Sequence, residues 1–212
     1  MEELGTFECD ILDRLEDEWI GRGYRPTYDE MAEALRTSKN RVYRHCQELE
    51  KLGYIRCEST SRGIVLLRTI DGYPVTTGGY RIPVLGNISA GDPILLPDNT
   101  EPTHWIDVTS KMVLGNPKGV FALVVRGDSM IEDRVYDGNT VLIRRQDFAE
   151  DGDTIAARLL IDRTTPQTTL KKFYRVGDRI QLQPRNGSLQ ARLYESQDVE
   201  ILGKLLSVLN IE

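Results

Sequence analysis

The feature that most constrains this chain is a change of hydrophobic period close to residue 69. Before it, apolar residues recur every three or four positions, which is the spacing of amphipathic helices. After residue 80, short apolar runs alternate with Gly, Asp and Asn turns, which is typical of β-strands. We therefore expect two domains, a mainly helical one at residues 1–68 and a mostly-β one at residues 82–212. Between them, residues 69–81 are rich in Gly, Pro and Thr and predict a linker that favours neither helix nor strand.

The first domain begins with an amphipathic helix that should end near Gly21 or Gly23, because its apolar positions are Phe7, Ile11, Leu12, Leu15 and Trp19. A second, short helix is expected from Thr27 to Leu35. Thr27 and Glu30 have the spacing of a capping box, in which each side chain binds the other residue's backbone amide.

A third helix is expected to start after Ser38 and to end at Gly53, with its apolar stripe formed by Val42, Cys46 and Leu49. Residues 54–57 and 63–67 then look like two strands around a polar turn. Two helices joined by a tight turn, followed by a hairpin, are typical of a winged helix-turn-helix.

The third helix is basic on its exposed side, although the chain as a whole carries a net charge of −6. This helix is the second one of the helix-turn-helix, and the N-terminal part of that helix enters the major groove of double-stranded DNA. Asn40 suits adenine, Arg41 or Arg44 suits guanine, and the remaining cations suit phosphates. The candidate DNA-binding residues are Arg36, Ser38, Lys39, Asn40, Arg41, Tyr43, Arg44 and the wing's Arg62. The alternative is a basic face that is merely solvated.

In the second domain, Ser129 lies in a Gly-containing turn directly after the apolar run 121–125. A serine nucleophile needs a base within hydrogen-bond reach. The chain has two histidines, His45 in the basic helix and His104 in a predicted loop, so a histidine base is poorly supported. A lysine kept neutral by burial is the alternative base. Lys171 and Lys172 are the candidates, and strand alternation alone does not decide between them.

Short motifs are spread along the chain in the order Arg25-Pro26-Thr27, Glu30-Met31-Ala32, Ser61-Arg62-Gly63-Ile64, Ile82-Pro83-Val84-Leu85-Gly86, Ser89-Ala90-Gly91-Asp92-Pro93, Gly127-Asp128-Ser129-Met130 and Asp137-Gly138. In these motifs the chain resembles the LexA repressors of the SOS response, within the wider class of LexA-like S24 peptidases. The resemblance spans nearly the whole chain and implies a two-domain α+β fold, a winged helix-turn-helix followed by a mostly-β domain similar to LexA and signal peptidases.

The resemblance implies that Ser129 is a nucleophile that cuts the Ala90-Gly91 bond of its own chain. It selects Lys171 as the base, counted back from family positions at Gly177 and Pro184, although residues 160–167 look longer than the usual hairpin. Backbone amides of Asp128 and Ser129 would form the oxyanion hole. The implied partners are operator DNA, a second copy bound through the C-terminal domain, and a RecA filament on single-stranded DNA that stimulates cleavage.

Two other functions remain open: a phage-type or other stress-responsive self-cleaving repressor, and a peptidase that acts on other proteins. The three cysteines form no CxxC pair, and no apolar stretch is long enough to span a bilayer. We therefore expect a cytoplasmic protein with no membrane association. No metal or cofactor is expected.

Overall fold

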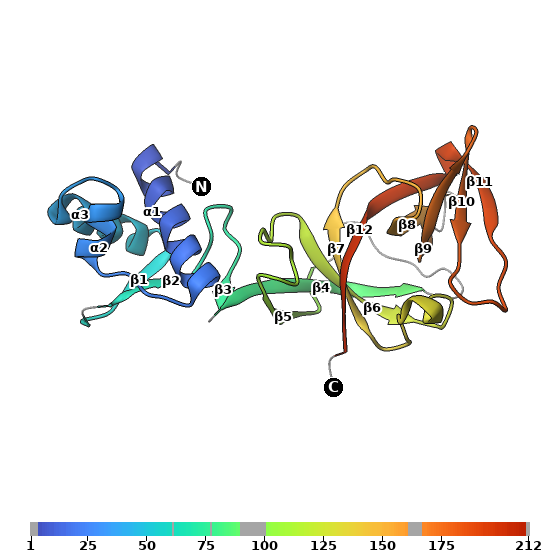
Figure 1. Ribbon diagram of the computed structural model, residues 1–212, viewed down its shortest axis with the longest axis horizontal. Coiled ribbons are helices and arrows are strands. Elements are labelled where there is room, and N and C mark those ends of the chain that lie inside the picture. Colours follow the sequence, from blue (N-terminus) through green and yellow to red (C-terminus); the bar gives the residue numbers. More distant parts are fainter. Residues whose placement is uncertain (1–3, 61, 77, 90–100, 161–166, 211–212) are drawn as a thin grey trace. The chain divides into compact units, whose positions relative to one another are not determined.

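The computed structural model describes residues 4–60, 62–76, 78–89, 101–160 and 167–210. The chain divides into two compact units, shown in Figure 1. The first comprises residues 1–82 together with 107–111 and 115–118, and the second comprises 83–106, 112–114 and 119–212.

The first unit contains the three helices and the hairpin that the sequence predicts. Helix α1 (Thr6–Glu16) continues into a short π-helical turn, η1 (Asp17–Gly21), and Gly23 follows with a positive φ. The other elements are α2 (Tyr28–Ala34), α3 (Lys39–Lys51), β1 (Ile55–Cys57) and β2 (Ile64–Leu66). Strands β1 and β2 pair antiparallel, which confirms the wing.

Local signals in the sequence set the ends of these helices. Thr27 and Glu30 form the predicted capping box at the start of α2. Ser38 caps α3, because its hydroxyl accepts the amide of Arg41. Gly53 follows α3 with φ +76°, a left-handed conformation in which glycine is the least strained residue. Caps of this kind each stabilise a helix by about 1 kcal/mol.

The apolar stripes of the three helices and the wing meet in one core. Its fully buried members are Ile11, Leu12, Leu15, Met31, Val42, Cys46, Leu49, Ile55 and Ile64. The three cysteines are free thiols, and burial raises the pKa of Cys46 to about 12. Cys46 therefore packs as a small apolar residue.

The expectation that residues 69–81 avoid regular structure is wrong in part. A short strand, β3 (Val75–Thr76), pairs antiparallel with the start of β4 (Gly79–Ser89). Val75 and Thr76 are β-branched and favour extended backbone, while Gly78, with φ +83°, allows the tight reversal between the two strands. Local pairing therefore overrides a composition that is rich in turn residues.

The second unit is built on one large, mainly antiparallel sheet. Among the described residues, its helical pieces are two 3-10 turns, η2 (Ile131–Asp133) and η3 (Ser196–Asp198), which confirms the mostly-β prediction. His104 lies in a strand rather than in the predicted loop, because residues 104–109 pair with β4. The remaining strands are β5 (His104–Thr109), β6 (Val120–Arg126), β7 (Thr140–Arg145), β8 (Thr154–Leu159), β9 (Gln167–Val176), β10 (Arg179–Gln183), β11 (Arg192–Glu195) and β12 (Val199–Leu209).

Strand β4 closes part of this sheet on itself. It runs parallel to β6, and at its last residue Ser89 it also pairs with Thr169 of β9. The path from β9 through β8, β12, β7 and β6 thus returns to β4. Inside it, Ile88, Leu123 and Leu170 are fully buried in one apolar cluster. The closure brings the ends of β4, β6 and β9 together.

Candidate active site and nucleic-acid interface

Ser129 lies in the turn that follows β6, and this turn is held at both ends. Gly127 has φ +94°, which strongly favours glycine, and its amide donates to Oδ1 of Asp137 at 2.8 Å. After the serine, Met130 is fully buried in the core. These contacts explain why glycine, methionine and the distant aspartate accompany the serine in the sequence. The serine itself is buried.

The side chain of Lys171, on β9, reaches Ser129. Its Nζ lies 2.7 Å from Oγ of the serine, 2.9 Å from Oγ1 of Thr169 and 3.1 Å from the carbonyl oxygen of Leu170. No carboxylate is among these three partners. The lysine is therefore surrounded by neutral oxygens, which stabilise a positive charge less than an ion pair would.

Burial, together with the positive charge of Arg192, lowers the pKa of Lys171 to about 8, and burial is the larger of the two causes. Desolvation penalises the charged form of a lysine, so the neutral amine becomes accessible near physiological pH. A nucleophile that contacts a base with such a pKa is the arrangement that proton abstraction requires.

Lys172, the other candidate, lies elsewhere. Its Nζ donates to the carbonyl of Gly152 at 3.0 Å and lies 3.4 Å from Oδ2 of Asp133. Neighbouring residues of a strand point to opposite faces, so only one of the two lysines can approach Ser129. The geometry favours Lys171 as the partner of the serine.

Ser89, the last described residue before the predicted cleavage bond, lies beside the same groups. Its side chain and backbone are almost fully buried, and its carbonyl accepts the hydroxyl of Thr169 at 3.2 Å. Thr169 therefore contacts both Lys171 and the end of β4. Ala90 and Gly91 lie outside the described residues, as does Ser61 of the wing.

A cleft of about 400 Å³ opens next to Ser129 and Lys171. Apolar side chains, including Leu159, Leu182 and Leu189, form much of its wall. A cleft that combines apolar walls with convergent polar groups is the usual form of a binding site for a small molecule or a short peptide segment.

The nucleic-acid interface predicted on α3 is an exposed face opposite the buried stripe. Lys39, Asn40, Arg41, Tyr43 and Arg44 are all exposed, and Ser38 lies at the helix start. Arg36 is also exposed and occupies the turn before α3 with φ +50°. The geometry is therefore compatible with a helix that enters the major groove.

Several of these cations also contact their own unit. Nζ of Lys39 lies 2.8 Å from Oδ2 of Asp29, and the guanidinium of Arg41 lies over the ring of Phe7 at 4.3 Å. Tyr43 packs edge-on against the ring of Tyr28.

The wing's Arg62 makes several contacts within the unit. It donates to the carbonyl of Arg25 at 2.9 Å, pairs with Glu30 and lies over the ring of Tyr24. These contacts fix the wing against α2, a role that the sequence reading did not include.

Two family models match the chain. The LexA DNA binding domain matches residues 1–63, and the Peptidase S24-like family matches residues 83–206. A LexA repressor of Herpetosiphon aurantiacus is 37% identical over 191 residues, which are 88% of each chain. LexA repressors of Caldicellulosiruptor saccharolyticus and Leptospira biflexa are 35% and 33% identical over 98% and 100% of this chain, and over 97% and 100% of their own.

The chain belongs to the LexA repressor family. It is therefore a LexA-type transcriptional repressor with a DNA-binding domain and a domain of the self-cleaving, S24-like serine peptidases. This confirms the resemblance and the fold class inferred from the sequence. In the part of the chain that the structure describes, no helix could cross a membrane and no group of His, Cys, Asp or Glu could hold a metal ion.

Sequence reasoning missed two partners of Lys171 in this LexA-family chain. Thr169 precedes the lysine by two positions, so strand alternation could have placed it on the same face. Arg192 comes from β11, and its effect on the lysine depends on the packing of β10 and β11 beside β9. No local pattern in the sequence signals that effect.

Proposed function

We propose that this LexA-family repressor controls DNA-damage genes and inactivates itself by cutting its Ala90-Gly91 bond with Ser129 and Lys171. The observation that carries the proposal is the 2.7 Å contact between Nζ of Lys171 and Oγ of Ser129, combined with the depressed pKa of the lysine. A RecA filament on single-stranded DNA is the proposed stimulus, and a homodimer held by the C-terminal domains is the proposed DNA-binding form.

Protonated Lys171 can donate to all three oxygens, and the same geometry can hold the neutral amine. A neutral amine has two hydrogens and one lone pair. The hydrogens can be donated to Oγ1 of Thr169 and to the carbonyl of Leu170, which leaves the lone pair facing Oγ of Ser129. The lysine is thus oriented to accept the serine proton.

In the proposed reaction, Lys171 takes the proton of Ser129 as Oγ forms a bond to the carbonyl carbon of Ala90. The backbone amides of Asp128 and Ser129 stabilise the resulting oxyanion. The protonated lysine then gives its proton to the nitrogen of Gly91 as the peptide bond breaks. A water molecule hydrolyses the acyl-enzyme, with the lysine as base again, and restores the serine.

The position of β4 supports cleavage within the same chain. Ser89 is fixed beside Thr169 and is directly followed by Ala90 in the sequence. The proposed scissile bond therefore follows, in the same chain, a residue that is held beside Thr169, so cleavage would be an intramolecular step instead of a bimolecular encounter. Small residues at 90 and 91 suit entry into a cleft with buried catalytic groups.

Cleavage would end repression by removing avidity. Two DNA-binding domains joined through a dimer bind a two-fold symmetric operator much more tightly than either domain alone. A cut after Ala90 separates the DNA-binding domain, residues 1–68, from the proposed dimerisation domain. The increase in operator affinity that comes from binding both half-sites at once is then lost.

The direct test is to incubate the purified full-length protein at pH values below and above about 8 and to follow product masses. Fragments 1–90 and 91–212 should form, with a rate that rises about tenfold per pH unit below the pKa of Lys171 and levels off above it. Ser129→Ala should yield neither fragment and should keep its DNA binding. Fragments from that variant would contradict the serine assignment.

Two further arms separate the alternatives. A RecA filament should accelerate cleavage at neutral pH; no acceleration would favour a repressor that responds to another stimulus. Mixing Ser129→Ala protein with the active protein tests cleavage in trans. Rapid loss of the inactive partner would favour a peptidase that acts on other proteins.

A further inference from the structure

The side chain of Asn186 makes an oriented contact with the nucleophile turn. It is almost fully buried, and its Nδ2 donates to the carbonyl oxygen of Asp128 at 3.1 Å. Its Oδ1 accepts both the amide of Ser188 at 3.1 Å and the hydroxyl of Ser188 at 2.8 Å. Because the oxygen end is bound by two donors, the NH₂ end must face Asp128.

This contact acts on a peptide group that the proposed mechanism uses. The carbonyl of Asp128 and the N–H of Ser129 belong to the same planar, trans peptide, in which they point in opposite directions. A donor that fixes the carbonyl therefore fixes the direction of the Ser129 N–H. A hydrogen bond to the carbonyl also polarises the peptide and strengthens its N–H as a donor.

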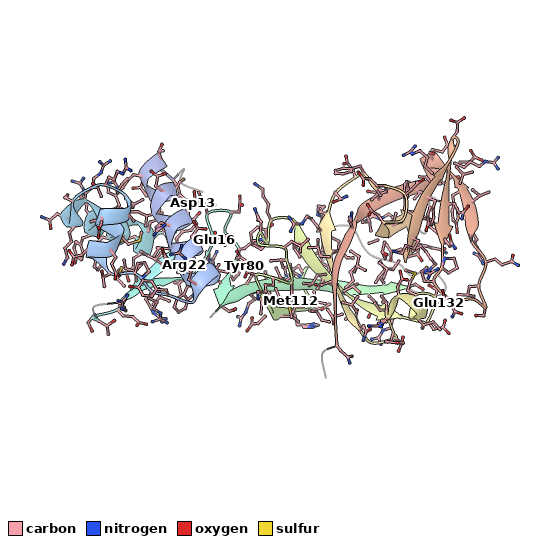
Figure 2. All side chains as sticks on the ribbon, viewed as in Figure 1. Asp13, Glu16, Arg22, Tyr80, Met112 and Glu132 are labelled. Atoms are coloured by element: carbon pink, nitrogen blue, oxygen red, sulfur yellow. The ribbon has the colours of Figure 1, made fainter. Side chains whose placement is uncertain are left out.

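The residue next to Asn186 holds the following peptide of the turn. The amide of Arg185 donates to the carbonyl of Ser129 at 2.6 Å, and the carbonyl of Arg185 accepts the amide of Glu132 at 2.9 Å. Glu132, which is labelled in Figure 2, lies in η2 directly after the nucleophile turn. Residues 185–186 thus contact both peptides that flank the serine.

We propose that Asn186 is a positioning residue for self-cleavage: its side-chain amide holds the Asp128–Ser129 peptide with the Ser129 N–H directed at the oxyanion. Asn186 does not touch the reacting atoms and acts through that peptide. The inference rests on the proposed function, because it requires that Ser129 attacks a carbonyl and that its own amide receives the developing charge.

The test measures the self-cleavage rate of the full-length protein as a function of pH for Asn186→Ala and Asn186→Asp. The alanine variant removes the donor. The aspartate variant keeps the shape and the bonds from Ser188 but has no hydrogen to give to Asp128. Ser188→Ala is the matched control, since it retains Asn186 and its donor. Thermal unfolding of each variant reports its folded fraction.

We expect the plateau rate at high pH to fall about 10- to 100-fold in both Asn186 variants, the loss that a misplaced catalytic group causes. In Asn186→Ala, the pH midpoint near 8 should stay unchanged, because Lys171 keeps its contacts. Ser188→Ala should cleave within about threefold of the wild type, since one donor to Oδ1 remains.

Three results would overturn the assignment: a wild-type plateau in both variants, a shifted midpoint with an unchanged plateau in Asn186→Ala, or a loss of rate that disappears after correction for folded fraction. Failure of the proposed function is distinguishable from these. It would show as fragments that persist in Ser129→Ala, whatever the Asn186 variants do.

Discussion

The two units use the same cationic side chains in opposite environments. On α3, Lys39 is exposed and pairs with an exposed carboxylate, Asp29. On β9, Lys171 is buried among neutral oxygens, and burial lowers its pKa to about 8. The exposed position of the first lysine suits its proposed contact with DNA phosphates, whereas burial suits the second for its proposed role as a base. Burial, more than residue type, separates the two proposed roles.

The largest expected effect comes from replacing the proposed base, Lys171, by a side chain that is always positively charged. Lys171→Arg should reduce self-cleavage at high pH at least about 10³-fold, because a guanidinium does not deprotonate in proteins. Lys172→Arg is the matched control, since that side chain pairs with Asp133 and contacts Gly152 instead of the serine. Product masses over time measure both. Equal losses in the two variants would contradict the distinct roles.

The cost of burying Lys171 should appear in stability. Its pKa is lower in the folded than in the unfolded state, so the folded protein binds fewer protons between pH about 8 and 10.5 and its stability rises with pH across that window. In a Ser129→Ala background, adding Lys171→Met should therefore stabilise the protein more at neutral than at alkaline pH. The difference should shrink by about 3 kcal/mol over the window.

Denaturant unfolding of the two proteins at several pH values measures this change. The substitution removes the same hydrogen bonds of Lys171 at every pH. Their loss therefore shifts the free energy of unfolding by a constant amount and does not change how it depends on pH. If the stability difference between the two proteins stayed constant with pH, burial would not penalise the charged form of Lys171 in the folded state, which would contradict the prediction.

A smaller effect is expected for the exposed cations of α3. Arg44→Ala should weaken binding to a DNA duplex selected for tight binding by about tenfold, which is the range for one lost base contact. Arg22→Ala is the control, because Arg22 is an exposed arginine that lies outside α3. It directly follows η1 and pairs with Glu18. Titrations at one salt concentration compare them. Equal affinities would place DNA recognition elsewhere.

The smallest expected effect concerns the ion pair of Lys39. Asp29→Asn should tighten DNA binding about twofold at low salt, because it removes a carboxylate next to a lysine that is proposed to bind phosphate, and the gain should vanish at high salt. Glu48→Gln, which breaks the exposed Lys51–Glu48 pair at the other end of α3, is the control. Equal gains from both variants would indicate a general charge effect.

The sequence by itself determined the elements whose signals are local. The capping box of Thr27 and Glu30, the cap at Ser38 and the left-handed Gly53 each act within a few residues, so spacing alone predicted α2 and α3. Alternating apolar runs likewise predicted the strands of the second unit. Where the signal is a composition, as in residues 69–81, it missed a short strand that exists through pairing with β4.

Tertiary structure decided what depends on distance and burial. Alternation placed Lys171 and Lys172 on opposite faces, but only the closure of the sheet brings β9 to the turn after β6 and selects the lysine that meets Ser129. The depressed pKa of Lys171 and the hold of Asn186 on the Asp128 carbonyl arise from groups far apart in the chain. Desolvation and oriented hydrogen bonds belong to the packed molecule, so a linear sequence carries the residues but not their chemistry.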